Sequence, residues 1–131
     1  LLKLAANPPK KLNAVQFFDI DNPLVAAAVA GLGIIYLFDP RLPVVSFTPT
    51  TDGGWKVSTR ATRAQLARGV DFSVAARRAA EAVGGRGGGH PVASGATIPK
   101  AGRERFLELI DSIVAEQLKA GRPVGAADGY A

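Results

Sequence analysis

The chain has 131 residues, of which 47% are hydrophobic and 21% are charged, and its formal net charge is +5 at pH 7. These values are typical of one soluble globular domain, and the lack of cysteine excludes a disulfide framework and a thiolate metal site. The sequence has no methionine, starts at Leu1 and shows no secretory signal pattern. We therefore expect a piece of a longer cytoplasmic protein.

The first third of the chain predicts a connector, a strand and an apolar helix. Residues 1–13 contain Pro8 and Pro9 and are typical of a linker that follows a preceding domain. Residues 15–20 have the pattern of a buried strand, and Pro23 is suited to the first position of a helix that extends to about Tyr36. The apolar stretch 24–38 is shorter than the roughly 20 residues of a membrane span, so we expect no membrane association.

The remaining elements complete an α/β pattern. Residues 44–48 and 55–60 flank a turn that contains Asp52 and Gly53, which predicts a hairpin. Asp71 or Ser73 is expected to cap a helix over 72–83 that ends at Gly84, and a strand over 95–99 and a helix over 102–119 follow. We predict a single α/β domain over 14–120, with a mixed central sheet of about five strands flanked by helices, and a mobile tail over 121–131.

Period-two alternation divides the strand over 55–60 between two faces. Trp55, Val57 and Thr59 share one face, so Lys56, Ser58 and Arg60 share the other. Trp55 is expected to pack in the core or the hairpin, although a ring of this kind can also stack on single-stranded bases.

The positive charge is concentrated in the middle of the chain. Between Lys56 and Arg86 there are seven basic residues and two acidic ones. Such a zone favours a polyanion such as a nucleic acid as partner, and the alternative is a basic face in contact with solvent alone.

The run from Gly84 to His90 holds five glycines, one arginine and the single histidine of the chain. Glycine amides beside an arginine can form a concave cradle for phosphate, and the alternative is a flexible linker. A Walker A loop is excluded, because His90 and Pro91 stand where Lys and Ser or Thr are needed. We expect a turn at the negative end of the preceding helix, with a short new helix beginning near Pro91.

Three stretches carry a family resemblance: Val-Ser-Thr-Arg at 57–60, Gly-Val-Asp-Phe-Ser at 69–73, and Gly-Arg-Gly-Gly-Gly-His-Pro-Val-Ala-Ser-Gly at 85–95. Together with the order of elements they resemble the DHH-associated domain of DHH-family phosphoesterases. The resemblance covers about residues 15–118 and is greatest to RecJ-like single-strand exonucleases of the archaeal kind.

The resemblance implies a substrate-binding domain that closes over a catalytic DHH domain, which would precede it in the same chain and hold Mn²⁺ or Mg²⁺. It implies that the partner is single-stranded nucleic acid or a short oligonucleotide, and that no cofactor is held here. The implied contacts to phosphate or nucleotide come from Arg60, Arg86, Gly87, Gly88, Gly89 and His90.

No catalytic or metal-binding residue is expected within the chain. Asp19 and Asp21 could touch a cation but are more typical of turn and cap residues, and one histidine cannot assemble a two-metal site. We therefore expect this fragment alone to be inactive. Three alternatives stay open: the substrate domain of a nano-RNA or pAp-type phosphatase, a tRNA-binding module like the carboxy-terminal domain of alanyl-tRNA synthetase, and a domain that binds only a protein partner.

Overall fold

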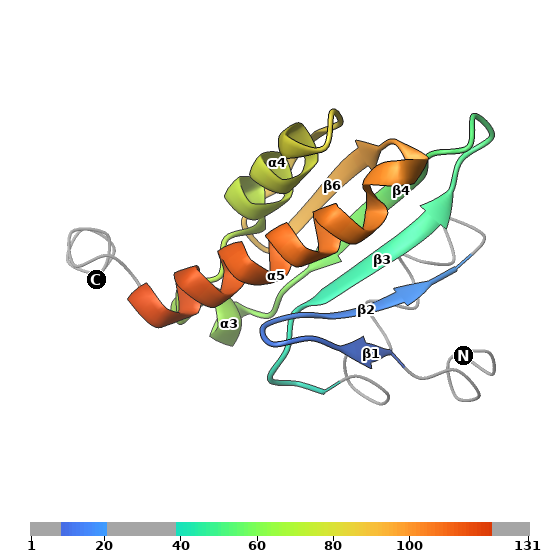
Figure 1. The fold of residues 1–131 in the computed structure, drawn as a ribbon. Helices are drawn as coiled ribbons and strands as arrows, with labels where there is room; N and C mark the ends of the chain where they lie inside the picture. Colours follow the sequence, from blue (N-terminus) through green and yellow to red (C-terminus); the bar gives the residue numbers. More distant parts are fainter. Residues whose placement is uncertain (1–8, 21–38, 122–131) are drawn as a thin grey trace.

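The computed structural model describes residues 9–20 and 39–121, which form one α/β unit with a six-stranded sheet (Figure 1). The predicted α/β class and mixed sheet are confirmed, with six strands instead of about five. The helix expected from Pro23 to about Tyr36 lies outside the described residues, as do 122–131.

The strand order in the sheet is β1-β2-β3-β4-β6-β5. The strands are β1 (Lys10–Lys11), β2 (Gln16–Asp19), β3 (Val44–Pro49), β4 (Trp55–Arg60), β5 (Arg86–His90) and β6 (Ala93–Ile98). Strands β2 and β3 are parallel, and every other neighbouring pair is antiparallel. Strand β1 falls within the range 1–13 that we expected to be a linker.

The predicted hairpin joins β3 and β4 through a turn closed by its own side chains. Asp52 accepts hydrogen bonds from the Gly54 amide, at 3.1 Å, and from the Thr50 hydroxyl. These two bonds lower the pKa of the Asp52 carboxyl from its usual value, with the Thr50 hydroxyl as the larger cause. Gly53 has φ +90°, which explains the glycine after Asp52.

Within residues 9–20 and 39–121, three helices and one short 3-10 turn accompany the strands: α3 (Arg63–Ala67), α4 (Phe72–Ala82), η1 (Lys100–Gly102) and α5 (Arg103–Ala120). Helices α4 and α5 lie on the same face of the sheet (Figure 1). The short α3 was not predicted, although Thr62 and Gln65 form its capping box at the expected three-residue spacing. In the described part of the chain, no helix has the length and apolar character needed to cross a membrane.

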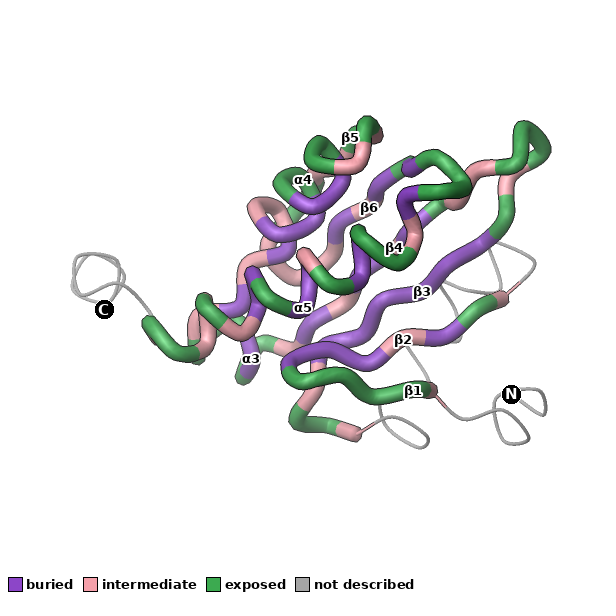
Figure 2. The backbone as a smooth tube through the Cα atoms, in the orientation of Figure 1, coloured by how far each residue is buried: buried purple, intermediate pink, exposed green. Residues whose placement is uncertain are grey.

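The core lies between the sheet and helices α4 and α5, and Figure 2 shows buried positions along both. Phe47, at its centre, makes edge-on contacts with the rings of Trp55 and Phe106. The Arg103 guanidinium lies 4.3 Å from the Phe47 ring centre and bonds Asp19 at 2.6 Å. Trp55 therefore packs on the helix-covered side, as its alternation pattern predicts.

A buried carboxylate on helix α5, that of Asp111, binds the backbone that leads into β2. Asp111 is 7% exposed, and its Oδ1 accepts from the amides of Ala14 at 2.7 Å and Val15 at 3.1 Å. Its Oδ2 accepts from the amide of Asn13 at 3.3 Å. One side chain thus pairs three backbone donors, of which the amides of the buried residues Ala14 and Val15 would otherwise lack this partner.

We expect Asp111→Ala to lower the free energy of unfolding by about 2–4 kcal/mol, because it leaves the buried amides unpaired. Urea denaturation followed by the fluorescence of Trp55, the single tryptophan, measures the loss. Asp111→Asn keeps one acceptor oxygen and should lose about half as much. Equal stability of the wild type and Asp111→Ala would contradict the assigned role.

Candidate functional site

The glycine run begins with the end of helix α4. The Gly85 amide donates to the Ala80 carbonyl at 2.8 Å, and the Gly84 amide donates to the Glu81 carbonyl at 3.2 Å. Gly84 has φ +83°, so the pair forms the Schellman arrangement that ends many helices. The predicted helix end at Gly84 is therefore confirmed.

Residues 86–90 form a strand, which corrects the expectation of a turn or loop. Strand β5 pairs antiparallel with β6 from Arg86, opposite Thr97, to His90, opposite Ala93. It is the last strand in the sheet order, so its outer edge has no strand partner among the described residues. Alternate backbone amides of such an edge point away from the sheet and can meet a ligand.

Three of the glycines are required by packing. A Cβ atom on Gly87 would lie 2.8 Å from the Ala76 carbonyl oxygen of α4. A Cβ on Gly85 would lie 2.2 Å from the Thr97 carbonyl oxygen, and one on Gly89 would lie 2.8 Å from the Ser94 Cα. Helix α4 and strand β6 thus approach β5 too closely for any side chain on these residues.

Gly88 differs from Gly85, Gly87 and Gly89 in the space around it. It has φ +156°, and a Cβ built on it meets nothing within 4 Å. Its backbone conformation favours glycine, while the space above it is open. Among the β5 glycines, Gly88 is therefore the one above which a ligand finds open space in the side-chain direction.

Strand β5 runs back along α4, so that His90 lies near the beginning of the helix. The Phe72 amide, in the first turn of α4, donates to the Pro91 carbonyl at 2.9 Å. The prediction of a new helix that begins near Pro91 is wrong, because Pro91 and Val92 form the turn between β5 and β6. The expected dipole repulsion consequently applies to the Gly84 end of the run and not to His90.

The turn after His90 is anchored on both sides. The Ala61 amide, which follows Arg60, donates to the Val92 carbonyl at 2.8 Å. The Ser94 hydroxyl donates to the His90 carbonyl at 2.8 Å. These bonds hold the ends of β4 and β5 at fixed positions relative to each other.

The strand register places Arg60 and His90 in one row. Arg60 pairs with Ala93, and Ala93 pairs with His90. Side chains opposite each other share a face, and two strand spacings separate the outer members by about 10 Å. We call Arg60, Ala93 and His90 the proximal row.

Two further rows lie parallel to the proximal row on the same face. The middle row consists of Ser58, Gly95 and Gly88, and the distal row consists of Lys56, Thr97 and Arg86. All nine positions are exposed or intermediate, and we call them the open face. On the helix-covered side of β4 and β6, by contrast, the buried positions are Val57, Thr59, Ser94, Ala96 and Ile98. The open face therefore carries small residues in its middle row, and Lys56, Arg60, Arg86 and His90 on the flanking strands β4 and β5.

Sequence reasoning placed Lys56 on the face of Arg60 but did not include it among the site residues. The alternation along β4 could have indicated Lys56 as a site residue. That Arg86 lies in the same row as Lys56 follows only from the pairing of β4, β6 and β5. Lys56 and Arg86 are both exposed.

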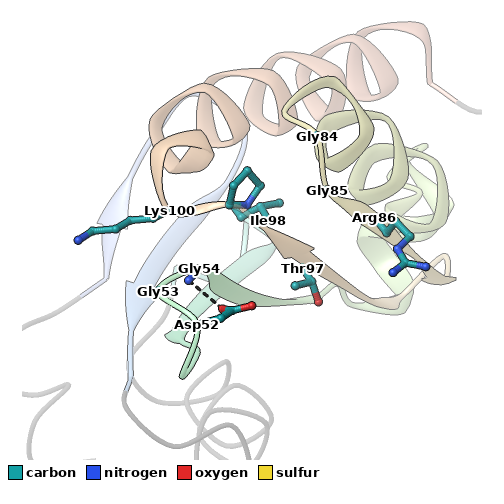
Figure 3. Close-up of a pocket in the computed structure, with 10 residues that line it drawn as sticks. Asp52, Gly53, Gly54, Gly84, Gly85, Arg86, Thr97, Ile98 and Lys100 are labelled. Atoms are coloured by element: carbon teal, nitrogen blue, oxygen red, sulfur yellow. Dashed lines mark hydrogen bonds between the residues drawn. The ribbon is translucent and has the colours of Figure 1, made fainter.

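A cavity of about 620 Å³ opens beside the distal row (Figure 3). Its lining comes from the β3–β4 turn, the end of α4 and the end of β6: Asp52, Gly53, Gly54, Gly84, Gly85, Arg86, Thr97, Ile98, Pro99 and Lys100. In Figure 3 the side chains of Arg86 and Thr97 extend away from helices α4 and α5. Two residues of the distal row thus also border the cavity.

No metal centre is found in the described ranges 9–20 and 39–121, where no three His, Cys, Asp or Glu side chains are placed to share an ion. Asp19 pairs with Arg103, and Asp21 lies outside the described residues. We therefore derive no metal-dependent step from these residues.

The comparison with protein families identifies the domain. The model of the DHHA1 domain matches residues 14–116. A curated relative, an uncharacterized protein of Methanocaldococcus jannaschii, is 37% identical over 110 residues. That match covers 84% of this chain but only 24% of the relative, so the chain spans about a quarter of that protein.

Three solved structures have a similar fold at low sequence identity. The C-Ala domain of Aquifex aeolicus alanyl-tRNA synthetase gives a TM-score of 0.58 at 11% identity, covering 84% of this chain and 97% of that one. A structure described as the DHH domain of a member of a family of ribosomal proteins gives a TM-score of 0.62 at 17% identity, covering 88% of this chain and 30% of that one. A pGpG-specific phosphodiesterase from Vibrio cholerae gives a TM-score of 0.59 at 11% identity, covering 88% of this chain and 38% of that one.

We expect Gly87→Ala to lower the free energy of unfolding by about 1–3 kcal/mol, because the added methyl group forces α4 away from β5. Gly95→Ala is the matched control in β6, since its Cβ would lie 3.5 Å from the nearest atom. Its stability should stay within about 1 kcal/mol of the wild type. Urea denaturation measures both, and equal values for the two variants would contradict the packing role of Gly87.

Proposed function

The chain belongs to the DHHA1 domain family found in DHH-family phosphoesterases, and we propose that its open face binds the phosphates of single-stranded nucleic acid or a short oligonucleotide. The proximal row is the observation that carries this proposal. Arg60 and His90 come from strands on either side of β6, and the register brings them to the same face.

The residues of this row have the chemistry that phosphate requires. Arg60 offers a planar fork of N–H donors, and the His90 imidazole can donate from a ring nitrogen at the other end of the row. Outward amides along the edge of β5 add backbone donors, and Gly88 leaves them accessible. The small residues between the two side chains allow a strand to lie close to the sheet.

The parent protein is proposed to be a metal-dependent hydrolase of the RecJ-like single-strand exonuclease kind. In that arrangement a preceding DHH domain holds Mn²⁺ or Mg²⁺ and performs the hydrolysis, while this domain positions the substrate and supplies no metal ligand. A nano-RNA or pAp-type phosphatase is the alternative, and the fold shared with a pGpG-specific phosphodiesterase makes a short substrate reasonable.

A tRNA-binding module is a second candidate, because the C-Ala domain of an alanyl-tRNA synthetase shares the fold. The two candidates differ in the nucleic acid that competes best. Unlabelled single-stranded oligonucleotide displaces a bound labelled oligonucleotide under the first, whereas folded tRNA displaces it at much lower concentration under the second.

We expect Arg60→Ala and His90→Ala each to weaken the binding of a fluorescent single-stranded oligonucleotide about tenfold, because each removes a contact to phosphate. Fluorescence anisotropy at several salt concentrations measures the affinity, which should fall as salt rises. Arg78→Ala is the matched control, since Arg78 is exposed on α4 and carries the same charge. A loss in Arg78→Ala equal to that in Arg60→Ala would show that the position of the charge does not matter, and would contradict the assigned site.

We expect the isolated chain to release no nucleotide from the same oligonucleotide when Mn²⁺ or Mg²⁺ is added. A two-metal hydrolytic site needs several converging ligands, which the described residues do not provide. Separation of the products by gel electrophoresis tests this. Metal-dependent cleavage that is lost in His90→Ala would contradict the division of labour between two domains.

A further inference from the structure

The distal row repeats the arrangement of the proximal row at the other end of the open face, with one long polar side chain on β4 and one on β5. Lys56 on β4 and Arg86 on β5 flank Thr97 on β6, as Arg60 and His90 flank Ala93. Four residues along β4 separate Lys56 from Arg60, which corresponds to about 13 Å. A stacked strand rises about 3.4 Å per nucleotide, so the two rows are several nucleotides apart along such a strand.

The surface between the rows does not obstruct such a path. Ser58, Gly95 and Gly88 form the middle row, and none carries a side chain larger than a hydroxymethyl group. No ion pair joins Lys56 or Arg86 to a carboxylate among the described residues. Both cations are therefore available for an external anion.

The cavity beside the distal row provides room for more than a phosphate. Its volume of about 620 Å³ lies within the range of about 300–1,000 Å³ that is usual for small-molecule sites. Arg86 borders it near the open face, whereas Asp52 contributes a carboxylate whose pKa is lowered and which therefore stays charged. A phosphate is favoured beside Arg86, and hydrogen-bond donors of a sugar or base are favoured beside Asp52.

We propose that the open face selects oligonucleotides over mononucleotides, with one phosphate at the proximal row, a later phosphate between Lys56 and Arg86, and the adjoining nucleoside in the cavity. This inference rests on the proposed function and specifies its substrate class. The distal row acts as a second subsite, which only a chain of several nucleotides can reach when its end is held by Arg60 and His90.

The test compares hexathymidylate with thymidine monophosphate as ligands of the intact 131-residue chain. We expect Lys56→Gln and Arg86→Gln each to weaken hexathymidylate binding about five- to tenfold, and thymidine monophosphate binding by no more than about twofold. Each substitution should also reduce the slope of log affinity against log salt by about 0.7 for the hexamer, the value for one phosphate contact of a single strand.

Two further variants separate the possible results. Arg60→Ala should weaken both ligands, and Arg78→Gln, the matched charge control on α4, should weaken neither by more than about twofold. If Arg60→Ala weakens both ligands while Lys56→Gln and Arg86→Gln have no effect, or affect both ligands equally, the second subsite is refuted and the proposed function stands. If Arg60→Ala also has no effect, the proposed function itself fails.

Discussion

The close approach of helix α4 to the edge strand β5 is the constraint on which the site depends. Ala76 and Gly87 meet at backbone distance, with no space for a side chain on Gly87. One side of β5 is thereby occupied by the helix, and the other side is left for Arg86 and His90. The packing that completes the core therefore also fixes the direction in which the two polar residues of the strand project.

The sequence predicted the helices and strands in which hydrophobic side chains recur at a regular spacing. The hairpin over 44–60, helix α4 with its end at Gly84 and helix α5 follow from alternation, capping and helical spacing. Strand β5 could not be predicted in this way, because three successive glycines have no side chains to alternate. Its strand conformation comes from pairing with β6, a tertiary interaction that a local pattern does not contain.

The site, too, was predicted where a local pattern places a residue and missed where strand pairing places it. Arg60 and Lys56 were placed on one face by the alternation in β4, but the rows that join them to His90 and Arg86 require the register of three strands. We expected the dipole of α4 to repel phosphate along the whole run from Gly84 to His90. That expectation also failed because the strand conformation of the run was not predicted. A loop would have kept the whole run at the helix end, whereas a strand carries His90 back toward Phe72.

The composition of the open face limits what it can recognise. Its middle row offers glycine and serine, and none of its nine described positions is Phe, Tyr or Trp, while Trp55 packs on the opposite face against Phe47. The planar groups that could stack on a base are therefore the guanidinium groups of Arg60 and Arg86 and the imidazole of His90, whereas the contacts proposed for the cations are to phosphates, which carry no sequence information. Under the proposed function, such a face fixes the path of a strand mainly through phosphate contacts, which do not depend on the sequence of bases.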